Sequence, residues 1–177
     1  RALAAAVKYL RRKGAPLASF STEFIRLFYV QASRAKLRSF RISGFRTCTR
    51  QAELIYGNWK RAYKKGGLKA AAAWQRRVYG TKSRYSKKML TIFKAIQAGT
   101  ETVANWIAYF KTQYGPGLPK PSHCNGRAFD VTPYSRATRR VLTKTMTAGA
   151  QRGLFKPYGR TGIVSEGNHY HVALTAP

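Results

Sequence analysis

The stretch that decides the fold runs from Ser122 to Thr132 and reads SHCNGRAFDVT. Its first half is polar and contains a glycine, as a loop does, and its second half, Ala128 to Thr132, has the composition of a short strand. His123 stands in the loop half and Asp130 in the strand half. We therefore expect the chain to fold back here, so that the loop brings a histidine close to a carboxylate on the strand.

A second segment, Glu166 to His171, reads EGNHYH and leads into a predicted strand from Tyr170 to Leu174. Residues two apart in a strand face the same side, so His169 and His171 are expected to point to one site while Tyr170 points away. All three histidines and the only aspartate of the chain lie in these two segments, and the whole chain has only five acidic residues. This concentration of rare side chains makes the two segments the first candidates for chemistry.

The other patterns are mostly helical, with a predicted break at Gly66-Gly67 and a predicted N-cap at Ser135. One further strand is expected at residues 37–42, before a turn at Ser43-Gly44. The predicted helices cover residues 2–12, 22–32, several segments between 49 and 98, a helix starting at Thr100-Glu101, and 135–152. This mixed order predicts an α+β fold with a small antiparallel sheet flanked by helices. We expect a basic helical extension at 1–35, and a domain at 36–177 that carries a basic helical insertion at about 54–112.

The charge of the chain is extreme, with thirty-four lysines and arginines against five acidic residues and a formal charge of +29. Such a surface attracts polyanions, and nucleic acid, anionic lipid and anionic cell-wall polymers all qualify. The basic segments 60–65 and 76–88 also contain tyrosines that could stack on bases. No run approaches the roughly 20 apolar residues of a membrane span, so we expect no transmembrane helix.

The chain has two cysteines, Cys48 and Cys124. They are too few for a disulfide framework and lack the spacing of a thiolate zinc site. Two alternatives stay open: both are free thiols, or they approach each other, because each lies near a segment assigned to the same site.

The two histidine segments together offer the ligands of a metal centre. A catalytic zinc ion takes three protein ligands, and His123, Asp130 and one of His169 or His171 supply that set. Glu166 stands just before these histidines, where a carboxylate is a suitable general base. The pattern predicts metal-assisted hydrolysis.

Three blocks of the sequence resemble a known family. Ser43-Gly44-Phe45-Arg46-Thr47 with Gln51 is similar to the family's Ser-Gly-Tyr-Arg-Ser segment, residues 123–130 fit its His-x-x-Gly-x-Ala-x-Asp pattern, and residues 169–171 fit its His-x-His. In these blocks the chain resembles the zinc D-Ala-D-Ala carboxypeptidases and L-alanyl-D-glutamate endopeptidases that cut peptidoglycan stems and share a site with hedgehog signalling domains. The resemblance covers about residues 37–174. Residues 1–35 have no recognised counterpart, and residues 54–112 are longer and more basic than in relatives.

The resemblance implies roles for the site residues. His123 and Asp130 would be zinc ligands, and Arg46 would hold the carboxylate of the peptide substrate. Ser122 precedes His123, where the family often has a small polar residue, and would also bind substrate. By the His-x-His pattern the third ligand is His171, and His169 has a base or electrostatic role. By a Glu-x-x-His pattern the third ligand is His169, and Glu166 is the base. We favour His171, because residues 171–174 resemble the family's closing strand.

The function expected from the resemblance is a zinc-dependent peptidoglycan peptidase, of carboxypeptidase or endopeptidase type. Such a hydrolase would degrade cell wall as a bacteriophage endolysin or as part of a virion, and would act at the bacterial cell envelope. The alternative is a highly basic nucleic-acid-binding or structural virion protein, which retains the zinc site because bound metal stabilises the fold.

Overall fold

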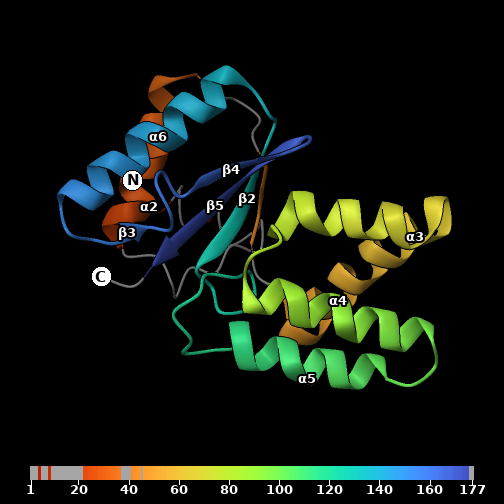
Figure 1. Cartoon of the computed structure of the whole chain (residues 1–177). Helices are drawn as coiled ribbons and strands as arrows, with labels where there is room; N and C mark the ends of the chain where they lie inside the picture. Colours follow the sequence, from red (N-terminus) through yellow and green to blue (C-terminus); the bar gives the residue numbers. More distant parts are fainter. Residues whose placement is uncertain (1–3, 5–7, 9–21, 37–40, 45, 176–177) are drawn as a thin grey trace. The chain divides into compact units, whose positions relative to one another are not determined.

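The computed structural model describes residues 4, 8, 22–36, 41–44 and 46–175. Within these residues it contains five α-helices and five β-strands (Figure 1). The chain divides into two compact units. The first, which we name the sheet unit, comprises Arg1–Arg46 and Pro116–Pro177, and the second, the helical unit, comprises Thr47–Gly115.

The sheet unit contains one antiparallel sheet, as expected for the α+β fold. Its strands lie in the order β1-β2-β5-β3, and β4 also pairs with β5. The strands are β1 (Arg41–Ser43), β2 (Ala128–Thr132), β3 (Lys156–Pro157), β4 (Ile163–Glu166) and β5 (His169–Thr175). The two strands predicted around the site, β2 and β5, are therefore direct neighbours.

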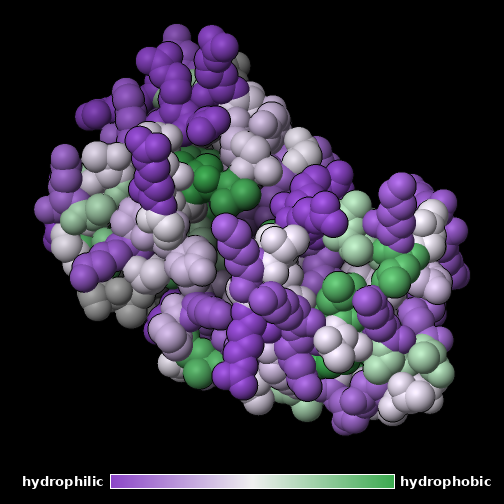
Figure 2. All heavy atoms as spheres, in the orientation of Figure 1, coloured by the Kyte–Doolittle hydropathy of each residue, from purple (hydrophilic) through white to green (hydrophobic). Residues whose placement is uncertain are grey.

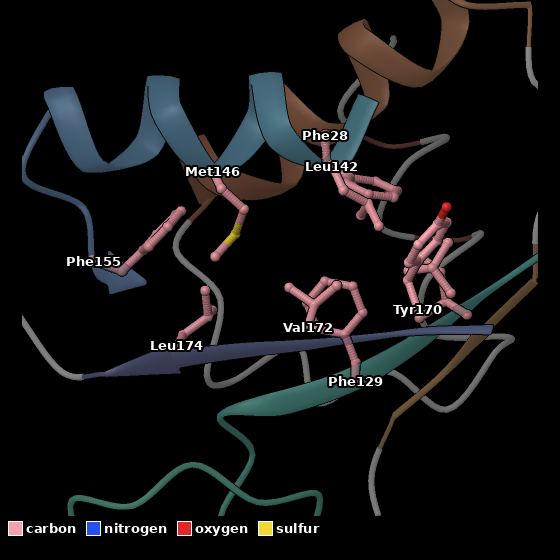
Figure 3. Packing of buried hydrophobic residues seen from close by; sticks show 10 residues of the cluster. Phe28, Phe129, Leu142, Met146, Phe155, Tyr170, Val172 and Leu174 are labelled. Atoms are coloured by element: carbon pink, nitrogen blue, oxygen red, sulfur yellow. The ribbon is translucent and has the colours of Figure 1, made fainter. Parts of the chain in front are cut away.

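Two helices pack against each other in the sheet unit, α2 (Thr22–Arg34) and α6 (Arg136–Gln151). Ser135 caps α6 as predicted, because its hydroxyl accepts the backbone N–H of Thr138 at 3.1 Å. Figure 3 shows the side chains that fill the space between α6 and the sheet, and the labelled ones are Phe28, Phe129, Leu142, Met146, Phe155, Tyr170, Val172 and Leu174. Alternate residues of β5 belong to this core, which leaves His169 and His171 for the opposite face.

The helical unit is built from α3 (Cys48–Tyr79), α4 (Arg84–Gln97) and α5 (Val103–Tyr114), which pack on one another. Its centre is aromatic: Trp59, Phe93 and Trp106 are fully buried. The predicted break in α3 is confirmed, because Gly66 and Gly67 have non-helical backbone angles. The unit extends beyond the expected residues 54–112 at both ends, and Thr102 rather than Thr100 caps α5.

Three further expectations concern the termini, the membrane and the cysteines. Of the predicted helix at 2–12 only residues 4 and 8 are described, both helical, and the rest lies outside the described residues. No helix in the described part of the chain is long and apolar enough to cross a membrane. Cys48 and Cys124 are both disulfide-bonded, which decides between the two alternatives left open by the sequence.

Candidate metal centre

The strand register brings the two histidine segments together. In the antiparallel pair β2–β5, Asp130 stands opposite His171, and in the pair β4–β5, Glu166 stands opposite His169. The turn between β4 and β5 contains only Gly167 and Asn168, and Gly167 adopts a φ of 70°, which favours glycine. This tight hairpin fixes Glu166 beside the histidines of β5.

Asp130 lies at the centre of the site. Its Oδ1 is 2.9 Å from Nδ1 of His171, 3.2 Å from Nε2 of His123 and 3.7 Å from Nε2 of His169. Its Oδ2 accepts a hydrogen bond from Arg46 at 3.4 Å. Burial by itself raises the pKa of Asp130, but the hydrogen bonds and charges of His123 and His171 outweigh it and hold the pKa well below its usual range. Asp130 is therefore a carboxylate at neutral pH, and its negative charge is available to a cation.

His123 is oriented by the backbone of a distant segment. Its Nδ1 lies 2.9 Å from the carbonyl oxygen of Gly44 and donates to it, and its own carbonyl accepts the N–H of Arg46 at 3.3 Å. The same ring places Nε2 3.2 Å from Oδ1 of Asp130. A divalent cation bound by both atoms would replace this contact with two metal–ligand bonds, with the Gly44 carbonyl as the outer contact that such histidines usually have.

The three ligand atoms also lie close enough together to be compared with the spacing of a zinc site. Two donors, each about 2.1 Å from a tetrahedral ion, lie about 3.4 Å apart. The ligand atoms of His123, Asp130 and His171 all lie within 4.8 Å of one another, and so do those of Asp130, Glu166 and His169. The first group contains two buried residues and two imidazoles, whereas the second contains the exposed Glu166. The first group fits a zinc site better, because it supplies two imidazole nitrogens and because His123 and Asp130 are buried.

His169 and Glu166 form a pair beside Asp130. Nε2 of His169 lies 3.2 Å from Oε2 of Glu166, and Nδ1 lies 3.0 Å from Oδ1 of Asn168. The ring of His169 is thus held from both sides. Its Nε2 faces the carboxylates of Glu166 and Asp130, and its Nδ1 faces Asn168. Asn168 was not identified from the sequence, since asparagine is common in tight turns and carries no other signal.

Arg46 and Ser122, the two predicted substrate-binding residues, have different surroundings. The side chain of Arg46 is 30 % exposed at the edge of the site, so part of its guanidinium faces solvent. Ser122 is buried, and its hydroxyl accepts the N–H of Asn125 at 3.2 Å and lies 3.4 Å from the sulfur of Cys124. These contacts are made within the loop itself, and the substrate site proposed below is built on Arg46.

The loop before β2 is organised by Asn125, which the sequence did not single out. Its Oδ1 accepts the N–H groups of Ser122 and Arg127, and its Nδ2 donates to the carbonyl of Lys120 at 2.6 Å. Asparagine side chains often replace backbone partners in this way in turns. The position of His123 therefore depends on a neighbour that is not part of the site.

Comparison of the chain with models of known families, with curated proteins and with solved structures finds no match. The resemblance to zinc peptidases is thus carried by three short blocks of sequence. Within the sheet unit, residues from all three blocks lie around one carboxylate: Arg46, His123 with Asp130, and the His169–His171 pair.

Proposed function

We propose that the protein is a zinc-dependent peptidase that hydrolyses peptidoglycan peptides. The observation that carries the proposal is the convergence of His123 and His171 on one oxygen of the buried Asp130, at 3.2 and 2.9 Å. The His169–Glu166 pair lies next to the same oxygen. The site thus collects ligands for a metal and, beside them, groups that can move a proton.

His123 through Nε2, Asp130 through Oδ1 and His171 through Nδ1 would hold the zinc ion. When bound, zinc would supply polarisation of the scissile carbonyl and activation of the attacking water at neutral pH. The Gly44 carbonyl keeps His123 in the orientation that presents Nε2, and the pairing of β2 with β5 keeps Asp130 and His171 adjacent. These two features would keep the three ligands near one another when the metal binds.

Glu166 is proposed as the general base. Its side chain is 41 % exposed, so water and substrate can reach it. The carboxylate accepts a proton from the attacking water and returns it to the leaving amine. Nε2 of His169 donates a hydrogen bond to Glu166 at 3.2 Å, and this contact positions the carboxylate of Glu166. His169 would also stabilise negative charge that develops beside its ring during the reaction.

Arg46 is proposed to bind the free carboxylate of the substrate peptide. A guanidinium presents a planar set of donors that matches a carboxylate with two parallel hydrogen bonds. Arg46 is anchored to Oδ2 of Asp130 and partly exposed, so it can hold the peptide next to the catalytic groups.

Two properties of the whole chain support a place at the bacterial cell envelope or in a phage virion. Cys48 and Cys124 are disulfide-bonded, and disulfides persist in oxidising environments and are rare in the cytosol. A formal charge of +29 would hold the enzyme on anionic cell walls.

The proposal is tested with the full-length protein, loaded with one equivalent of zinc and incubated with purified peptidoglycan stem peptides. Mass spectrometry should detect new peptide products, and Glu166→Gln should abolish them while metal analysis still finds bound zinc. A metal-loaded protein that leaves every stem peptide intact contradicts the peptidase. If His171→Ala then only lowers the unfolding temperature, the zinc site is structural, and the alternative of a basic virion protein replaces the enzyme.

A further inference from the structure

The helical unit carries positive charge that its own residues do not balance. Residues 47–115 contain fourteen lysines and arginines but only two acidic residues, Glu53 and Glu101. All fourteen basic side chains are exposed. Glu53 pairs with Arg50 at 3.7 Å, and Glu101 accepts the N–H of Thr102 at the start of α5. A surface of this kind attracts a polyanion, and its binding is favoured by the release of counterions.

The same unit presents aromatic rings at its surface. Trp74, Tyr79, Tyr109 and Tyr114 are only half-buried, unlike the fully buried Trp59 and Trp106. They are linked through the buried Tyr85, whose ring centroid lies 6.1 Å from that of Tyr79, 6.0 Å from Tyr109 and 5.0 Å from Tyr114. Trp74 extends the chain of contacts at 6.0 Å from Tyr79. The rings therefore form one connected group, supported from within by Tyr85.

Basic residues lie next to two of these rings. Trp74 and Arg77 are three residues apart on α3 and share a face of the helix. Arg84 starts α4 and lies within electrostatic reach of Tyr109 on α5: burial raises the pKa of Tyr109, and the charge of Arg84 counteracts the rise. Figure 2 shows that hydrophilic residues cover much of one face of α3, α4 and α5.

We propose that the helical unit binds single-stranded nucleic acid, with bases stacked on Trp74 and Tyr109 and phosphates bound by Arg77 and Arg84. A polyphosphate, a wall polymer or a lipid surface offers negative charge but no planar rings, so it would leave the half-buried aromatic residues unused. A duplex keeps its bases stacked inside. A single strand alone offers both phosphates and accessible base faces, and binding of this kind does not depend on sequence.

The test uses the full chain and a fluorescently labelled 20-nucleotide single strand of mixed sequence, followed by fluorescence anisotropy at several salt concentrations. Replacing Trp74 and Tyr109 together by alanine should weaken binding about tenfold or more, whereas replacing both by phenylalanine should largely preserve it. Lys87 is exposed on α4, three residues after Arg84, and is taken as a third phosphate contact, so the triple variant Arg77→Gln, Arg84→Gln, Lys87→Gln should weaken binding and lower the salt slope by about 2. Its matched control, Arg136→Gln, Arg139→Gln, Arg140→Gln, removes the same charge from exposed positions on α6 and should change affinity less than about threefold.

Tryptophan fluorescence gives a second readout that does not require an alanine variant to fold. Trp59 and Trp106 are 0 % exposed, so quenching by an added single strand reports on Trp74 and should disappear in Trp74→Phe. Equal affinity for single strand, duplex and inorganic polyphosphate, or tighter binding to wall polymer or anionic vesicles, overturns the proposal. None of these residues belongs to the metal centre, so the result of this experiment neither supports nor contradicts the proposed peptidase activity.

Discussion

At the scale of single residues, the site depends on one carboxylate. Asp130 contacts three imidazoles and one guanidinium, and it is buried, so its charge is poorly screened by water. Without a metal it is the acceptor that keeps these side chains together. With a metal bound, Asp130 would be a ligand. The arrangement of side chains around Asp130 would then hold the fold together without metal and bind the ion when it is present.

The first prediction concerns the stability of the metal-free protein. Because the pKa of folded Asp130 lies below its unfolded value of about 3.9, the carboxylate stabilises the fold above that value, and this contribution is lost as the pH falls toward the folded pKa. Asp130→Asn should therefore lower the free energy of unfolding by roughly 2 to 3 kcal/mol at pH 7. Urea unfolding with a chelator present should show this difference shrinking below about pH 4. A difference that grows on acidification would contradict the assignment.

The second prediction separates the two candidate third ligands. His171→Ala should weaken zinc binding by at least about 100-fold, because it removes a ligand, whereas His169→Ala should leave zinc binding within about tenfold and reduce peptide hydrolysis. Zinc competition with a fluorescent chelator measures the first quantity, and mass spectrometry of stem-peptide products measures the second. If His169→Ala loses the metal and His171→Ala keeps it, the roles of the two histidines are exchanged.

The residues of this site could be found from the sequence because they are rare. Because the chain has only three histidines and one aspartate, these residues could be selected as candidates by type alone. The two-residue period of a strand correctly placed His169 and His171 on the same face of the sheet. Asn125 and Asn168 could not be found in this way. Their partners are backbone groups and a neighbouring ring, which the sequence does not show, and asparagine is an ordinary turn residue.

At the scale of elements, patterns with strong local signals were predictable, and two short strands without such a signal were not. The capped helix α6 follows Ser135 as expected, and α3 breaks at its glycine pair. The strands β3 and β4 were missed, because two to four residues carry too little pattern and are held in place by pairing with β5. Without β4, the sequence could place Glu166 near His169 but could not show that the two stand opposite each other.

The third prediction compares two glycines of α3. Gly67 has φ 63° and ψ −161°, a conformation that is essentially restricted to glycine, whereas Gly57 lies within the helix with open space around its Cβ position. Gly67→Ala should lower the free energy of unfolding by about 2 kcal/mol, and Gly57→Ala should raise it by about 0.5 to 1 kcal/mol. Urea unfolding followed by circular dichroism measures both. If Gly67→Ala is neutral, the break in α3 is not required by the fold.

At the scale of the whole molecule, the unbalanced charge should make stability depend on ions. With a formal charge of +29, the folded chain repels itself, and salt screens this repulsion within a Debye length of about 10 Å at 0.1 M. Anions that bind several basic residues at once should act more strongly than anions that only screen. The compact state is then stabilised by the same kind of ligand that the surface is proposed to bind.

The fourth prediction follows from this coupling. Raising sodium chloride from about 10 to 150 mM should increase the unfolding temperature by several degrees, on the order of 5 °C, because the unfolded chain spreads its charges farther apart and gains less from screening. Phosphate or sulfate at equal ionic strength should increase it further, since a ligand of the folded state stabilises it by mass action. Thermal unfolding followed by circular dichroism at constant pH measures both effects. An unfolding temperature that falls with salt would mean that attractive ion pairs dominate, which the five acidic residues of the chain cannot readily supply.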